Sequence, residues 1–130
     1  EELCQALPFK VNSLGYISDT STMVTAYSCA DLFVIPSLED NLPNTIMESM
    51  ACGTPCVGFA TGGIPEMIDH RVNGYVANYK DAGDLACGIR WVLEHEDRQA
   101  LSDACVKKVR DNYTEEVVAR QYIALYKKLL

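Results

Sequence analysis

The chain has 130 residues, and its 18 acidic and 11 basic side chains give a formal net charge of −7. This length is typical of one domain with a sizeable core, and the excess of acid argues against broad binding to nucleic acid or to anionic membranes. No apolar run approaches the roughly 18 residues of a membrane span, and no signal-peptide pattern opens the chain. These features favour a cytoplasmic location and predict no transmembrane segment.

The first predicted element is a strand over residues 9–14, which is followed by a turn at Gly15. Asp19, Thr20 and Ser21 then offer side-chain caps for a helix. One apolar face of that helix is marked by Met23, Val24, Tyr27 and Ala30.

Residues 32–60 carry the strongest pattern in the chain. Residues 32–35 are a continuous apolar run of strand length, which a sheet covered on both faces requires. An acidic loop follows, then a helical pattern that ends at Gly53, and then a second buried strand over residues 56–60. The acidic loop should therefore lie at the carboxyl end of a strand, where open α/β sheets bind their ligands.

The rest of the chain predicts a tight turn at Gly62-Gly63, a short helix over residues 64–68 and a short extended piece after Asn73-Gly74. Three helices should follow, with caps at Asp81 and Thr114, and the apolar stripe of the last comprises Val118, Tyr122, Leu125 and Leu129. Alternating strands and helices predict parallel pairing with right-handed crossovers. We therefore expect an α/β fold, a Rossmann-like parallel sheet with flanking helices and a helical C-terminal third.

The six cysteines are Cys4, Cys29, Cys52, Cys56, Cys87 and Cys105, and none of them forms a CxxC pair. A chain with this much apolar sequence does not need a disulfide framework, so we expect six free thiols that fill small spaces in the core of a protein from a reducing compartment. A zinc site and a catalytic histidine are disfavoured, because His70 and His95 lie far apart in sequence.

Several motifs of this chain resemble those of one enzyme family. They are Pro36-Ser37, Asp40, Glu48, the segment Ala51-Cys52-Gly53-Thr54-Pro55, the segment Gly62-Gly63-Ile64-Pro65-Glu66, and Asn73-Gly74-Tyr75. Together they resemble retaining GT-B glycosyltransferases, in particular glycosyltransferase family 4 (group 1). Asp40 and Glu48 match the acid-x7-acid signature, although the family usually has Glu at the first position, where Glu39 is the alternative. The resemblance implies that residues 1–130 are part of a C-terminal nucleotide-sugar-binding domain.

The residue types at these positions suit a sugar nucleotide. Glu48 could accept hydrogen bonds from both ribose hydroxyls, because charged acceptors bind such donors strongly. The acidic loop would hold the transferred sugar, and helix starts with free N–H groups would hold the diphosphate. The resemblance implies the same roles, with Asp40 and Glu48 as catalytic residues and a donor-binding set of Glu39, Asn41, Leu42, Asn44, Glu48, Gly62 and Gly63.

The chain has no Lys or Arg between Lys10 and Arg71, although a departing diphosphate needs positive charge. In the family, a basic pair earlier in the C-terminal domain supplies that charge. We therefore expect the chain to be the donor-binding portion of a longer enzyme, inactive alone and partnered by an N-terminal acceptor domain. The resemblance implies a nucleotide-diphosphate sugar as donor, a hydroxyl acceptor, retention of anomeric configuration, a role in polysaccharide biosynthesis and no metal or other cofactor. Peripheral membrane contact of the full enzyme stays open.

The sequence leaves other interpretations of the function and of the candidate site residues open. The function alternatives are a GT-B-type sugar-nucleotide epimerase and a non-catalytic nucleotide-sugar-binding module, whereas a receiver domain lacks its acidic cluster and late lysine here. Glu39 and Asp40 could be a solvated cap, Glu48 a surface residue, and Gly62-Gly63 only a turn. In the family, the last helix commonly crosses onto the other domain, so Tyr122, Tyr126 and Leu130 are either partner-facing or ordinary core and fringe residues.

Overall fold

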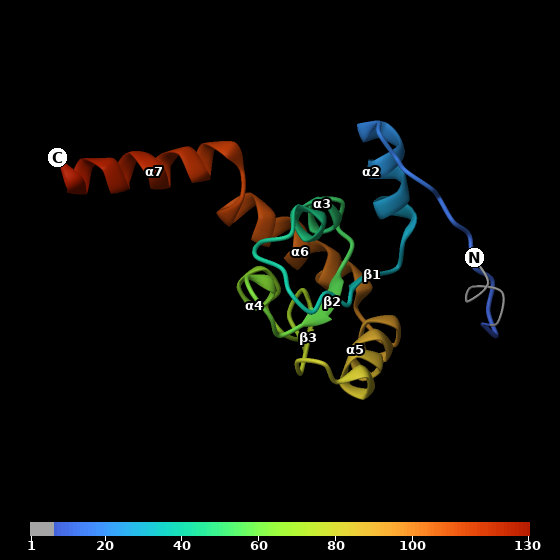
Figure 1. The fold of residues 1–130 in the computed structure, drawn as a ribbon. Helices are drawn as coiled ribbons and strands as arrows, with labels where there is room; N and C mark the ends of the chain where they lie inside the picture. The colour runs from blue at the N-terminus through green and yellow to red at the C-terminus, as the bar shows by residue number, and fades with distance from the viewer. Residues whose placement is uncertain (1–6) are drawn as a thin grey trace.

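The computed structural model describes residues 7–130, and a parallel three-stranded sheet in the order β1-β2-β3 lies at its centre (Figure 1). The strands are β1 (Phe33–Ile35), β2 (Cys56–Phe59) and β3 (Gly74–Ala77). Val34 pairs with Val57, and Gly58 pairs with Val76. The predicted α/β class and its parallel pairing are confirmed.

Six helices among the described residues flank or extend the sheet. They are α2 (Thr20–Cys29), α3 (Asn44–Ala51), α4 (Ile64–Met67), α5 (Ala82–Leu93), α6 (Arg98–Asn112) and α7 (Glu115–Leu129). The predicted caps at Asp19, Asp81 and Thr114 form, because each side chain accepts a hydrogen bond from the main-chain N–H three residues later. Gly53 ends α3 with a φ of +80°, the left-handed conformation predicted for it.

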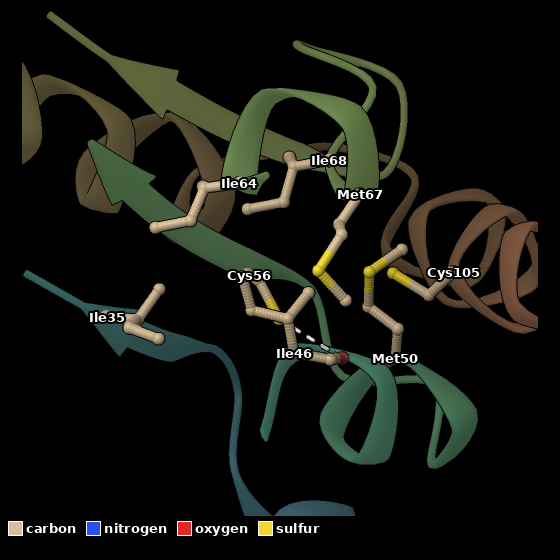
Figure 2. Close-up of a cluster of buried hydrophobic side chains, with 8 residues drawn as sticks. All are labelled: Ile35, Ile46, Met50, Cys56, Ile64, Met67, Ile68 and Cys105. Atoms are coloured by element: carbon tan, nitrogen blue, oxygen red, sulfur yellow. Dashed lines mark hydrogen bonds between the residues drawn. The ribbon is translucent and has the colours of Figure 1, made fainter. Parts of the chain in front are cut away.

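Two apolar clusters cover the two faces of β2. Figure 2 shows side chains from β1, β2, α3, α4 and α6 pointing into one space, and they are Ile35, Ile46, Met50, Cys56, Ile64, Met67, Ile68 and Cys105. Val57 and Phe59 point to the opposite face and pack with Val92 of α5. A strand covered on both faces needs a continuous apolar run, which is the pattern the sequence shows for β2.

The predicted strand over residues 9–14 is wrong. These residues form neither strand nor helix, and the side chains of Phe9 and Leu14 are 63% and 67% exposed. In Figure 1 this segment, in dark blue, lies near the end marked N and away from the sheet. A strand is stabilised by a neighbour that completes its hydrogen bonds and covers its side chains, and within residues 7–130 this segment has no such neighbour.

The C-terminal helix α7 is amphipathic as predicted, but it has no buried residue. Tyr122, Leu125 and Leu129 are 56%, 50% and 74% exposed, and Figure 1 shows α7 projecting from the body of the domain. The stripe therefore does not lie in the core of residues 7–130, and for Tyr122, Tyr126 and Leu130 the fringe and the partner-facing interpretations are left. That it faces a partner surface stays a prediction. No helix among residues 7–130 combines the length and apolarity needed to cross a membrane.

The five described cysteines are free thiols, but not all of them fill the core. Cys56 and Cys105 are buried, whereas Cys52 is partly buried and Cys29 and Cys87 are exposed. The prediction of core thiols is thus right for two positions and wrong for Cys29 and Cys87, which lie on outward faces of α2 and α5. Cys4 lies outside the described residues.

Candidate functional site

Two loops meet at the carboxyl end of the sheet. Residues 36–43 follow β1 and contain the acidic pair, and residues 60–63 follow β2. The main-chain N–H of Gly63 donates a 2.6 Å hydrogen bond to the carbonyl oxygen of Asn41. The Thr61 hydroxyl donates to the carbonyl oxygen of Leu38 at 3.2 Å. The acidic loop is therefore fixed by main-chain contacts at the sheet edge where α/β proteins bind ligands.

Gly62 and Gly63 make this close approach sterically allowed. A Cβ atom at Gly62 would lie 1.5 Å from the carbonyl oxygen of Asp40, and one at Gly63 would lie 2.2 Å from that of Asn41. Gly62 also has a φ of +51°, which side chains disfavour. The packing of the two loops accounts for both glycines, and any role of theirs toward a ligand stays a prediction.

The start of α3 presents unpaired main-chain donors. Within residues 7–130, the N–H groups of Asn41, Leu42 and Asn44 have no hydrogen-bond acceptor, and no side chain caps the helix because Pro43 occupies the N-cap position. Free N–H groups and the positive end of the helix dipole suit an anion.

The two acids of the loop differ in exposure. Glu39 is exposed and Asp40 is half-buried. The carbonyl oxygens of Asp40 and Asn41 are turned toward the second loop, where they contact Gly62 and Gly63. These two carbonyl oxygens are therefore covered by the second loop. Their partial negative charge does not point toward the unpaired N–H groups at the start of α3, where an anion would bind.

Glu48 lies one helical turn after Asn44, on the same face of α3 and about 6 Å farther along the axis. Its Oε2 atom accepts a 3.3 Å hydrogen bond from the Tyr27 hydroxyl. Glu48 also lines a pocket of 340 Å³ between α2 and α3, together with Ile17, Ser18, Asp19, Thr20, Met23, Val24, Tyr27, Ala51 and Cys52. Glu48 is thus an exposed residue that lines this pocket, and its role toward a ligand stays a prediction.

Tyr27 and the pocket wall before it were missed by the sequence interpretation. The sequence pattern places Tyr27 on the apolar face of a helix. It gives no sign of a contact between Tyr27 and Glu48, which lies 21 residues later. Burial, followed by the charge of Glu48, raises the pKa of Tyr27 to about 12. The phenol thus remains a protonated donor at neutral pH.

The histidines do not join this site. The Nδ1 atom of His70 accepts a hydrogen bond from the Val76 N–H at 3.1 Å, and the His95 ring packs against Trp91 with centroids 4.8 Å apart. Within the described part of the chain, no three His, Cys, Asp or Glu side chains gather in a way that could hold a metal ion.

Residues 1–95 match the family described as "Glycosyl transferases group 1", and the chain belongs to this family. It is 33% identical to an uncharacterized glycosyltransferase of Methanocaldococcus jannaschii, in an alignment that covers 98% of this chain and 33% of that protein. It is 26% identical to N-acetyl-alpha-D-glucosaminyl L-malate synthase of Bacillus anthracis, over 88% of this chain and 30% of that protein. The chain therefore spans about a third of the length of these relatives.

Solved structures show the same fold. Sucrose-phosphate synthase from Thermosynechococcus elongatus superposes with a TM-score of 0.75 at 28% identity, covering 86% of this chain and 28% of that one. The Anabaena protein HepE, in complex with UDP-glucose, gives a TM-score of 0.66 at 25% identity over 83% and 30% of the two chains. The predicted fold, part of a GT-B glycosyltransferase, is confirmed. Membership of family 4 and a retaining mechanism stay predictions.

Proposed function

We propose that this chain is the donor-binding portion of a retaining, family-4-type glycosyltransferase, which moves a sugar from a nucleotide-diphosphate donor to a hydroxyl acceptor. The observation that carries the proposal is the arrangement around α3. Unpaired N–H groups at its start and the carboxylate of Glu48 one turn later offer, in order, sites for an anion and for a pair of hydroxyls.

The diphosphate binds at the start of α3. The N–H groups of Asn41, Leu42 and Asn44 donate to its oxygens, and Gly62 and Gly63 keep the loop in the shape that exposes them. Residues 11–70 contain no Lys or Arg, so the positive charge that stabilises the leaving diphosphate comes from outside this segment. The proposal requires no metal ion.

The ribose binds at Glu48. Asn44 and Glu48 are about 6 Å apart along the axis of α3. This spacing places the ribose one helical turn beyond the diphosphate. A carboxylate accepts from both hydroxyls of a ribose diol, and such charge-assisted hydrogen bonds are stronger than neutral ones. The 340 Å³ pocket beside Glu48 has the volume of a small ligand site, and the nucleoside occupies it.

The transferred sugar binds at the acidic loop, with Asp40 as its main acceptor and Glu39 in a lesser role. Transfer then breaks the bond between the anomeric carbon and the diphosphate oxygen and forms a bond to the acceptor oxygen on the same face. The acceptor proton passes to the departing diphosphate. The same polypeptide supplies the acceptor site from an N-terminal domain.

The experiment is a transfer assay with the full-length enzyme. UDP-, GDP- and ADP-linked sugars are incubated with a panel of hydroxyl acceptors, and NMR spectroscopy of the product gives the anomeric configuration. We expect one donor class to be used, with retention, and no transfer by the 130-residue chain alone. An inverted product contradicts the retaining mechanism. A nucleotide sugar that is epimerised and not transferred supports the epimerase alternative.

A further inference from the structure

The hydroxyl of Tyr27 donates to Oε2 of Glu48 across the contact between α2 and α3. Tyr27 is 8% exposed, whereas Glu48 is exposed and faces the pocket between the two helices. Among residues 7–130, this hydroxyl is the one group that bonds to the Glu48 carboxylate. A buried donor thus restrains an exposed side chain that would otherwise sample several rotamers.

Both the ring and the main chain of Tyr27 are held by neighbouring residues. Its ring meets the ring of Phe33 edge-on, with centroids 5.6 Å apart and an interplanar angle of 86°. Its carbonyl oxygen accepts a 2.7 Å hydrogen bond from the hydroxyl of Thr54, which is 3% exposed. The position of the Tyr27 hydroxyl therefore follows from the packing of α2 against β1 and against the segment before β2.

We propose that Tyr27 is a positioning residue for nucleotide binding: its hydroxyl holds Oε2 of Glu48 so that Oε1 is presented to the ribose diol. The inference rests on the proposed role of Glu48 as the ribose acceptor. A carboxylate that is already oriented loses less conformational entropy when the ligand binds, so the nucleotide binds more tightly than it would to a free side chain. Tyr27 contacts no reacting atom and is not a catalytic residue.

A double-mutant cycle in the full-length enzyme tests the inference. Calorimetric titration with UDP, GDP and ADP first identifies the nucleoside diphosphate that binds best. Tyr27→Phe keeps the ring packing and the main-chain hydrogen bond from Thr54, and it should weaken binding about 3- to 10-fold, the range expected when one flexible side chain has to be ordered on binding. Glu48→Ala should weaken binding more. In the Glu48→Ala background, Tyr27→Phe should have less than about a twofold effect.

Tyr75→Phe is the matched control. It also removes a phenol that donates to a carboxylate, here Asp84 at 2.7 Å, but on β3 and outside the proposed site. Its effect on nucleotide affinity should stay within about twofold. A purely structural role for Tyr27 would lower the melting temperature without producing coupling to Glu48.

The outcomes separate the two proposals. If none of the three nucleotides binds, or if Glu48→Ala binds as well as the wild type, the role of Glu48 fails and the Tyr27 inference fails with it. If Glu48→Ala weakens binding but Tyr27→Phe does not, only the Tyr27 inference is overturned. The same holds if Tyr27→Phe weakens binding equally in both backgrounds, because the two residues then act independently.

Discussion

The main-chain N–H of Gly63 donates to the carbonyl oxygen of Asn41 at 2.6 Å, and this bond joins the loop after β2 to the acidic loop after β1. The loops touch main chain to main chain, since a Cβ at either glycine would overlap a carbonyl oxygen. The shape of the acidic loop therefore depends on residues that carry no side chain. This dependence leads to the first prediction.

Gly62→Ala should destabilise the domain and displace the acidic loop. The new Cβ would lie 1.5 Å from the Asp40 carbonyl oxygen, in addition to the strain of a positive φ. Gly15→Ala is the control, because Gly15 also has a positive φ but has nothing within 4 Å of its Cβ position. Thermal and denaturant unfolding should show Gly62→Ala to be less stable than Gly15→Ala by about 1–3 kcal/mol, the usual cost of overpacking. Equal losses in the two variants would mean that the loops can separate freely.

Asp40→Asn should lower turnover with the sugar donor and leave affinity for the bare nucleoside diphosphate nearly unchanged. The reason is that Asp40 is assigned to the sugar while the N–H groups of the loop hold the diphosphate. Loss of one hydrogen bond to a charged group corresponds to roughly a 10- to 100-fold decrease in kcat/KM. Steady-state kinetics and calorimetry of the full-length enzyme measure the two effects separately.

Glu39→Gln is the matched comparison for Asp40→Asn, since it makes the same change one residue earlier on a more exposed side chain. It should reduce turnover less. A damaging Glu39→Gln with a silent Asp40→Asn would show that the acid-x7-acid register is wrong by one residue. If both variants were silent, the acidic loop would be only a cap.

Stability should fall at alkaline pH because of the buried thiols. Burial raises the pKa of Cys56 and of Cys105 to about 12, whereas a thiol in an unfolded chain has a pKa of about 8.5. A raised folded pKa gives a contribution that is complete below the unfolded pKa and is lost as pH rises toward the folded one. The free energy of unfolding should therefore decrease between about pH 8.5 and pH 12.

Cys105→Ala should flatten that decrease by up to about 1.4 kcal/mol per pH unit, because one titrating group is removed. Cys87→Ser removes an exposed thiol and serves as the comparison variant. Denaturant unfolding across the pH range measures both variants. A slope that Cys105→Ala does not alter would show that Cys105 ionises alike in the folded and unfolded chains.

The sequence predicted the segment from β1 to β3 well, because local signals there agree with the packing. The apolar runs of β1 and β2 and the glycine after α3 are each decided by a few neighbouring residues. The strand predicted over residues 9–14 did not form, and the apolar stripe of α7 is exposed, for a common reason. An alternating or amphipathic pattern indicates that a segment has an apolar face, but it does not predict which part of the protein covers that face.

The candidate site was predictable only in part. Motif spacing placed the acidic loop and Glu48 at the carboxyl end of the sheet and on α3, and the structure confirms those positions in the fold. Their roles toward a ligand stay predictions. The contact between Tyr27 and Glu48 could not be predicted, because it depends on how α2 packs against α3. The close approach of Gly62 to Asp40 could not be predicted either, because the sequence shows a glycine pair but not which residues lie beside it.

The central claim, that α3 and its preceding loop bind a nucleotide-sugar donor, is tested most directly by calorimetric titration of wild-type and Glu48→Ala full-length enzyme with UDP-, GDP- and ADP-sugars. Glu96→Ala, an exposed acid between α5 and α6, serves as the control. The account predicts saturable binding of one donor class, weakened by about 1.5–3 kcal/mol in Glu48→Ala and unchanged in Glu96→Ala. Donor binding that is equally tight in all three proteins, or the absence of binding by any of these sugars, would contradict it.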